Sequence, residues 1–194
     1  MNILIVLAHP RPTSLNASLA GQLAAELGRR HSVVLTDLYR ENFDPVLKEN
    51  ELLDINYIAD DIRPYCDALI KAGCLIFIHP NWWGAPPAIL KGWVDRVIRL
   101  NVGYGFNDAG QGEPIKLLNI KHFFVFNTSN TPPARELAVF GDPLENIWKN
   151  CIADFLGTAH FERQMFSTVA GSTTEQRDSW IKECCGIVQN ALGS

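Results

Sequence analysis

The feature that most constrains how this chain can fold is a set of short apolar runs with little polar alternation. The runs span Asn2–Ala8, Ser32–Leu38, Cys74–His79 and His122–Asn127, and three of the four are apolar almost throughout. Continuous apolar runs of this length are typical of parallel strands buried on both faces of a sheet. A fifth run, Phe161–Val169, is more mixed and indicates an edge strand.

Amphipathic helical patterns lie between and after these runs. The expected helices cover 15–27, 57–72, 89–97, 144–156 and 180–192, the second being the weakest. Asp142, Pro143 and Glu145 suit the N-cap, the first turn and the N3 position of the fourth helix. Ser172 and Glu175 are expected to cap the start of the last helix.

Strands that alternate with helices predict an α/β protein with a parallel sheet and helices on both faces. Five strands and five helices match the flavodoxin-like strand order 2-1-3-4-5. We find no internal repeat or linker, so residues 1–194 are expected to form one domain. Two long polar loops, 39–56 and 100–118, are of a length that is usually functional or mobile.

Charge and composition exclude several classes of partner. The 17 basic and 21 acidic residues give a net charge of −4, which argues against a nucleic-acid partner. No stretch approaches the roughly 20 apolar residues that span a bilayer, and no secretory leader is recognisable. The five scattered cysteines indicate reduced thiols and a cytoplasmic location, and the dispersed histidines predict no metal site.

In open α/β sheets, ligands bind beyond the carboxyl ends of the strands. The segment after the first strand, 9–16, leads into a helix whose free N–H groups suit a phosphate. Ser14 can add a hydroxyl donor there, and His9 and Arg11 can add positive charge. An ordinary strand-to-helix connection with Ser14 as N-cap explains the same residues equally well.

Two further loops follow strands at the same edge. The loop after the third strand carries the adjacent Trp82 and Trp83 between proline and glycine residues, where the rings could wall an aromatic ligand. A hydrophobic plug or a dimer contact is the alternative interpretation. The loop after the fourth strand, 127–133, is small and polar, as expected of a cofactor edge or of an ordinary surface turn.

The sequence lacks the motifs of several other classes of enzyme and binding protein. No GxGxxG follows a strand, and no Walker A, GxSxG or HExxH pattern occurs. A phosphoacceptor receiver domain would need acidic residues at the ends of strands one and three. Those positions hold Ala8-His9 and His79-Pro80, which carry no carboxylate.

Taken together, the three loops resemble the flavodoxin-like NAD(P)H:quinone oxidoreductase family. That family includes DT-diaphorase, modulators of drug activity and ancillary subunits of potassium-efflux systems. The most specific similarity is PNWWGAPPAILKGWVDR at Pro80–Arg96, followed by IVLAHPRPTSLN at Ile5–Asn16. Asp37–Tyr39 and Phe43–Pro45 also match, and the resemblance covers nearly the whole chain, most closely up to about residue 130.

The resemblance implies a site for a flavin, FAD or FMN. The phosphate side would be held by His9, Thr13, Ser14, Leu15 and Asn16. The two sides of the ring would be bordered by Pro80, Asn81, Trp82, Trp83, Asn127, Thr128, Ser129 and Asn130. Trp82 and Trp83 with Tyr104 and Phe106 would form the substrate pocket, in a homodimer with its active site at the interface.

The implied activity is two-electron, ping-pong hydride transfer from NAD(P)H to a quinone or a related nitro- or azo-aromatic. Two alternatives stay open: a regulatory flavoprotein subunit of a potassium-efflux transporter, and a one-electron carrier. One departure bears on the chemistry. The tyrosine and histidine that relay protons in mammalian quinone reductases have no counterpart in 133–140, where Phe140 takes the histidine position. Arg135 is a candidate to stabilise an anion there, although a solvated surface arginine is the simpler interpretation.

Overall fold

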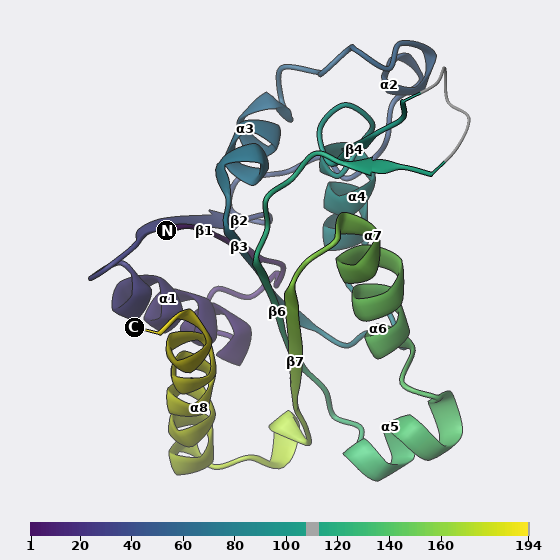
Figure 1. Cartoon of the computed structure of the whole chain (residues 1–194). Helices are drawn as coiled ribbons and strands as arrows, with labels where there is room; N and C mark the ends of the chain where they lie inside the picture. Colours follow the sequence, from purple (N-terminus) through teal and green to yellow (C-terminus); the bar gives the residue numbers. More distant parts are fainter. Residues whose placement is uncertain (108–112, 194) are drawn as a thin grey trace.

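The computed structural model describes residues 1–107 and 113–193. Its centre is a five-stranded parallel sheet with the order β2-β1-β3-β6-β7 (Figure 1). The strands are β1 (Asn2–Leu7), β2 (Ser32–Asp37), β3 (Cys74–Pro80), β6 (His122–Thr128) and β7 (His160–Phe166). Counted among themselves, these strands have the predicted order 2-1-3-4-5, and β7 lies at the edge as expected.

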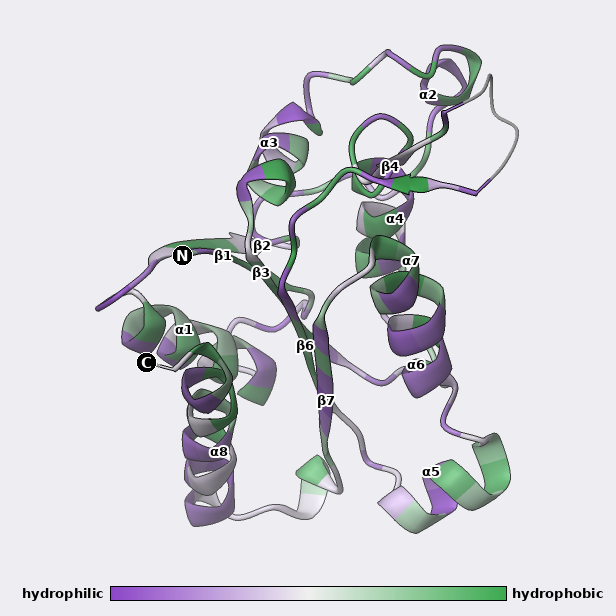
Figure 2. Ribbon diagram, viewed as in Figure 1, coloured by the Kyte–Doolittle hydropathy of each residue, from purple (hydrophilic) through white to green (hydrophobic). Residues whose placement is uncertain are grey.

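Helices cover both faces of the sheet, as the continuous apolar strands require. On one face lie α1 (Leu15–Leu27) and α8 (Thr174–Leu192) (Figure 1). The other face carries α3 (Arg63–Lys71), α4 (Ala88–Val97) and a segment composed of α6 (Pro143–Glu145), η1 (Asn146–Ala153) and α7 (Asp154–Leu156). Figure 2 shows α1 and α8 carrying both hydrophilic and hydrophobic residues, as helices packed on one side do.

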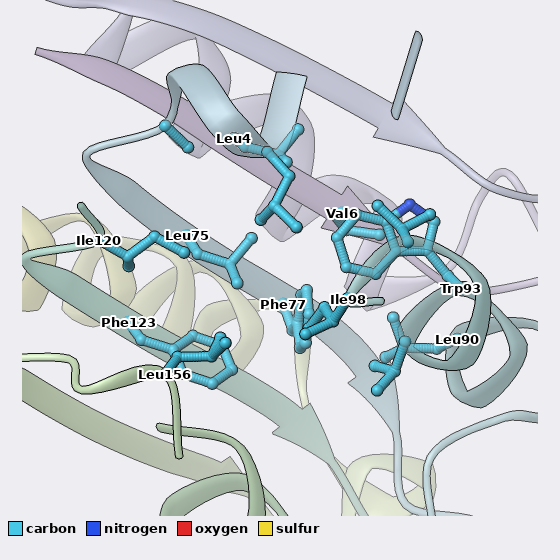
Figure 3. Packing of buried hydrophobic residues seen from close by; sticks show 14 of the residues in the cluster. Leu4, Val6, Leu75, Phe77, Leu90, Trp93, Ile98, Ile120, Phe123 and Leu156 are labelled. Carbon is cyan, nitrogen blue, oxygen red and sulfur yellow. The ribbon is translucent and has the colours of Figure 1, made fainter. Parts of the chain in front are cut away.

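Side chains of successive strand residues separate the core into two clusters. In β1, Ile3 and Ile5 face α1 and α8, whereas Leu4 and Val6 face the other layer. Figure 3 shows the cluster that contains Leu4 and Val6. Phe77 lies there among side chains from neighbouring strands and from α4. The Phe77 ring meets Trp93 edge-on at 5.5 Å between centroids.

The two long loops contain short elements that the sequence did not predict. Helix α2 (Glu49–Leu53) lies in the first loop, and β4 (Tyr104–Gly105) pairs with β5 (Ile115–Lys116) in the second. Helix α5 (Pro133–Phe140) and the 3-10 turn η2 (Val169–Gly171) lie at the carboxyl end of the sheet (Figure 1).

The first long loop is anchored by a buried charge cluster. Arg96 of α4 is fully buried, donates to Glu51 at 3.1 Å and to Asp61 at 2.8 Å, and also reaches the carbonyl oxygen of Asp44. Arg99 contacts the same Glu51 carboxylate at 3.6 Å. Part of the family-like segment Pro80–Arg96 therefore serves to hold this loop against α4.

One predicted helix start is wrong by a residue, and the other has the predicted positions without the expected capping bond. Thr173, not Ser172, is the N-cap of α8, since its side chain accepts a hydrogen bond from the Gln176 amide at 3.2 Å. Asp142 occupies the N-cap position of α6 but makes no capping bond. Its carboxylate pairs with Arg163 of β7, and Glu145 binds the same guanidinium at 2.8 Å. An ion pair to the neighbouring strand thus replaces the expected capping box.

No helix in the described part of the chain is both long enough and apolar enough to cross a bilayer. Among the same residues, no group of three or more histidine, cysteine, aspartate or glutamate side chains is arranged to hold a metal ion.

Candidate functional site

A cavity of about 920 Å³ opens at the carboxyl end of the sheet, between the loops that follow β1, β3 and β6. The order of the strands reverses between β1 and β3, which is where open α/β sheets bind ligands. Every residue predicted to contact a cofactor lines this cavity except Asn127. The topology has therefore brought together segments that lie more than a hundred residues apart in the sequence.

The loop after β1 delivers the beginning of α1 to the cavity. Ser14 is the N-cap, with its Oγ accepting a hydrogen bond from the Ala17 amide at 3.2 Å. The capping role and the ligand-facing position are thus combined in one residue, because Ser14 also lines the cavity. A helix start of this kind presents N–H groups and a partial positive charge to an anion.

His9 contributes a hydrogen-bonding ring to the cavity. Burial lowers the pKa of its imidazole below the usual value, which favours the neutral ring. Its Nδ1 accepts a hydrogen bond from the Arg11 amide at 3.1 Å, which leaves Nε2 carrying the proton. Positive charge at this end of the cavity comes from Arg11 and from Arg177 of α8, which both line it.

Thr128, at the end of β6, connects the three loops. Its Oγ1 accepts a hydrogen bond from Asn16 Nδ2 at 2.9 Å, and its carbonyl oxygen accepts one from the Asn81 amide at 2.6 Å. Asn16 is 2% exposed, and its Oδ1 has no hydrogen-bond partner within the described residues. A buried acceptor left open beside a cavity fits a ligand that donates a hydroxyl or amide hydrogen.

The loop after β3 presents its two indoles on a tight turn. Trp82 and Ala85 exchange backbone hydrogen bonds of 3.0 Å, and Trp83 adopts a positive φ of 57°. Trp83 is fully exposed and Trp82 is 42% exposed, so neither ring belongs to the core. A non-glycine residue held at positive φ beside a cavity is a form of strain that concentrates at functional sites.

Asn81 holds that turn from its inner side. Its Oδ1 accepts a hydrogen bond from the Gly84 amide at 3.0 Å, and its Nδ2 donates to Glu136 Oε1 at 2.9 Å. Glu136 belongs to α5 and is 2% exposed. The sequence does not predict Glu136 as a site residue, because nothing in its local pattern indicates that α5 folds against the turn.

The loop after β6 forms the remaining wall. Asn130 Oδ1 accepts a hydrogen bond from the Ala170 amide at 2.9 Å, which brings η2 to the cavity. Asn127 is fully buried instead of lining the cavity, and its Oδ1 accepts from Arg163 Nη1 at 2.8 Å. The other lining residues that sequence reasoning missed as site residues are Gly84, Thr131, Phe140, Pro143, Val169, Ala170 and Arg177.

Two of the predicted substrate-pocket residues, Tyr104 and Phe106, lie away from the cavity in the structure. Tyr104 and Phe106 follow α4, which runs from the carboxyl end of the sheet back to its amino end (Figure 1). The Tyr104 ring contacts Phe106 and Phe155, at centroid distances of 5.9 and 5.0 Å. Neither residue lines the cavity of its own chain.

Fold and cavity together define the class: a doubly wound α/β protein with a ligand cleft at the switch in strand order. The cleft is lined by the start of α1, by the aromatic turn and by the loop after β6, and the buried Asn16 Oδ1 in the first turn of α1 has no partner within the described residues. These features fit a flat heterocycle that carries a phosphate, as a flavin nucleotide does.

Comparisons with known proteins agree with this class. The family model described as "Flavodoxin-like fold" matches residues 1–184. An uncharacterized NAD(P)H oxidoreductase of Haemophilus influenzae is 33% identical over 177 residues, which cover 87% of this chain and 85% of that protein. The rat NAD(P)H dehydrogenase [quinone] 1 is 27% identical, over 92% of this chain and 74% of its own length.

A crystal structure of a Streptococcus mutans UA159 protein superimposes with a TM-score of 0.84 at 31% identity, covering 98% of this chain and all of that one. The chain spans about half the length of two further relatives, from Penicillium crustosum and Escherichia coli. This chain therefore belongs to the flavodoxin-like family of NAD(P)H oxidoreductases and quinone reductases.

Proposed function

We propose that this chain is a flavin-dependent NAD(P)H oxidoreductase that reduces quinones or related electrophiles by two electrons. The observation that carries the proposal is the single cavity wall formed by the α1 start, the Trp82–Ala85 turn and the Thr128 loop. The names of the relatives support NAD(P)H as the donor and a quinone as the acceptor. They support neither the transporter-subunit nor the electron-carrier alternative.

In this proposal the chain's own residues bind and orient the flavin. Ser14 and the first amides of α1, with His9 and Arg11, hold its phosphate side. Asn16 Oδ1 accepts a hydrogen bond from the ligand. The remaining contacts to the ring come from Pro80, Asn81, Trp82, Trp83, Thr128, Ser129 and Asn130, with Thr13 and Leu15 on the phosphate side. When bound, a flavin supplies the capacity to store a hydride between donor and acceptor.

The slot beside the ring accepts its two substrates in turn. Trp82 and Trp83 line the cavity, and their rings present flat apolar surfaces to a nicotinamide first and to a quinone afterwards. One slot that serves two substrates successively predicts ping-pong kinetics. The same slot argues against a one-electron carrier, which needs an exposed ring edge instead of a substrate pocket.

The proposal is tested by an anaerobic absorbance titration of the purified, flavin-loaded protein with NADPH and then with NADH. We expect the flavin bands to bleach directly, without a semiquinone spectrum, and to return when a quinone is added. A protein that takes up neither FMN nor FAD, or a bound flavin that neither nucleotide reduces, would contradict the proposal. Uptake of FMN or FAD during loading decides between the two flavins, and the titration decides between the two nucleotides.

We further propose that the working unit is a homodimer in which Tyr104 and Phe106 of one copy cover the cavity of the other. Their position at the far end of the sheet supports this, since they do not reach the cavity of their own chain. Exposed apolar side chains also support association between copies of the chain. Examples are Leu52 and Leu53 on α2, which are 66% and 79% exposed.

Subunit complementation tests the dimer. Ser14→Trp, which blocks the cavity, and Phe106→Ala are each expected to lower quinone turnover strongly. Two differently tagged chains carrying one change each, purified as a mixed pair, would regain one intact site because both defects fall in the other site. A mixed pair that stays as slow as either parent, or a monomer by light scattering, would contradict the shared site.

We also propose that residues 1–194 fold as one cooperative unit in the cytoplasm. All five cysteines are free, and four of them are buried, which suits a reducing compartment. A single unfolding transition, and an unchanged transition in the presence of a thiol reductant, are the expected results. Two separate transitions would contradict the single unit.

A further inference from the structure

The cavity wall contains one ionisable side chain that the proposed function leaves without a role. Glu136, in the first half of α5, borders the cavity and is 2% exposed. It is the only aspartate or glutamate among the described residues that line the cavity. A carboxyl group so nearly enclosed beside a site for redox chemistry calls for a chemical explanation.

The surroundings of Glu136 leave one of its carboxyl oxygens available. Asn81 Nδ2 donates to Oε1 at 2.9 Å, and Asn81 in turn holds the Gly84 amide. Within the described part of the chain, Oε2 has no hydrogen-bond partner, and no lysine, arginine or histidine comes within ion-pair distance of the carboxyl. The group is therefore oriented by the aromatic turn without being neutralised by a cation.

Reduction of a quinone to a hydroquinone takes up two electrons and two protons. A transferred hydride carries both electrons and one of the protons, so the second quinone oxygen is left as an anion. A proton donor within hydrogen-bond reach of that oxygen lowers the barrier and raises the rate, typically by a factor of about 10² to 10⁴.

We propose that Glu136 supplies this second proton to the quinone. The O–H bond of the Glu136 carboxylic acid breaks, a new O–H bond forms on the quinone oxygen, and the carboxylate regains a proton from water. Overall, NAD(P)H is oxidised, the quinone is reduced, and one solvent proton is consumed. The inference rests on the proposed function and assigns one of its catalytic residues.

The other ionisable groups of the cavity are less suited to this step. Arg11 and Arg177 carry guanidinium groups, which do not release protons near neutral pH. His9 has a lowered pKa because of burial, and its Nδ1 accepts a hydrogen bond from the Arg11 amide. Two charged neighbours of Glu136 are engaged elsewhere: Arg135, on the same helix, stacks on Phe140, and Asp142, whose amide donates to the Glu136 carbonyl at 3.2 Å, pairs its carboxylate with Arg163.

The test compares two electron acceptors in Glu136→Gln, since ferricyanide takes electrons without protons and a quinone needs both. A glutamine oxygen can still accept from Asn81, so the turn is kept while the transferable proton is lost. We expect quinone turnover to fall about 100-fold, at the lower end of the range for general acid catalysis. Ferricyanide turnover and flavin reduction by NAD(P)H should change by less than about twofold. Glu183→Gln, on the exposed side of α8, is the matched control.

Two further measurements separate proton transfer from positioning. Acetate should restore quinone turnover to Glu136→Ala, whose shortened side chain leaves room for a small acid. In protein labelled with ¹³C at the glutamate carboxyls, the signal missing from Glu136→Gln should shift when phenol, a redox-inert quinone analogue, is added. Equal losses with quinone and ferricyanide, or a Glu136 signal unmoved by saturating phenol, would overturn the inference. Failure of the wild-type flavin to be reduced would instead refute the proposed function.

Discussion

At the scale of single residues, the site depends on side chains that never reach the cavity. His79 is fully buried at the end of β3, next to Pro80. Its Nε2 accepts a hydrogen bond from Trp148 Nε1 at 3.0 Å, and its Nδ1 donates to the Pro80 carbonyl at 2.8 Å. These two hydrogen bonds place the proton of the neutral His79 ring on Nδ1. They also fix the position of Pro80, the first residue of the loop that carries Trp82 and Trp83.

His79 makes stability depend on pH. Burial lowers the pKa of its imidazole from 6.5 to about 4. Between these values the unfolded chain binds more protons than the folded chain, so stability present at pH 7 is lost as the pH falls from about 6.5 to 4. The loss from this group is about 3 kcal/mol at most.

Urea unfolding at pH 7, 6 and 5 measures this loss. In His79→Gln, whose side-chain oxygen can still accept from Trp148, the free energy of unfolding should fall less steeply over this range than in wild type. His9, His31 and His122 also have lowered pKa values and contribute equally to both proteins. Parallel slopes for variant and wild type would show that His79 is not the group responsible.

Gly92 lies where α4 and the backbone of the first long loop approach each other too closely for a side chain. A Cβ at this position of α4 would lie 2.2 Å from the carbonyl oxygen of Pro45, inside any real contact distance. Gly92→Ala is expected to lower the free energy of unfolding by about 3 kcal/mol, because the backbone of the first long loop would have to move. Gly21→Ala in α1, which meets nothing within 4 Å, is the control and should be neutral or stabilising by up to about 1 kcal/mol. Equal effects of the two changes in urea unfolding would refute the explanation.

At the scale of elements, the beginnings of helices decide which segments face the cavity. The start of α1 is turned toward the ligand cleft, whereas the start of α8 is closed by its own residues. Ser172 Oγ donates to the Val169 carbonyl at 2.7 Å and accepts from Arg177 Nε at 2.8 Å, which ties η2 to α8. Thr173 then caps the helix.

The cap assignment predicts a difference between two neighbouring residues. Thr173→Ala should lower the free energy of unfolding by about 1 kcal/mol, since the Gln176 amide loses its acceptor. Thr173→Ser, which keeps the hydroxyl, should recover most of that loss. Thermal unfolding of the two variants checks the assignment, and an alanine variant as stable as wild type would rule out the cap.

At the scale of the whole molecule, the cavity walls come from both ends of the chain. His9 precedes α1, and Arg177 lies in α8, yet both line the same space. A ligand bound there contacts segments from both ends of the folded chain, so its binding is linked to folding.

This linkage predicts that flavin raises stability by mass action. At a free flavin concentration 100 times the dissociation constant, the free energy of unfolding should rise by about 2.7 kcal/mol. Urea midpoints measured over a series of FMN or FAD concentrations check the logarithmic increase. Riboflavin, which lacks the phosphate, is the control ligand and should stabilise less at equal concentration. A midpoint independent of every flavin would place the cofactor elsewhere.

The sequence by itself determined the architecture and most of the cleft. Apolar runs without alternation specify strands covered on both faces, and the positions after those strands meet at one edge whatever the details of packing. This is why the sequence alone predicts a common site for the loops around Ser14, Trp82 and Thr128.

Only the tertiary structure decided the parts that depend on contacts between distant segments. Glu136 enters the cavity wall because α5 folds against the Asn81 turn, and Arg177 enters it because α8 packs beside α1. Asn127 turns away because Arg163, on the next strand, offers it a buried donor. None of these choices leaves a periodic or local signal, since each is determined by the energy of pairing two groups that meet only after the chain has folded.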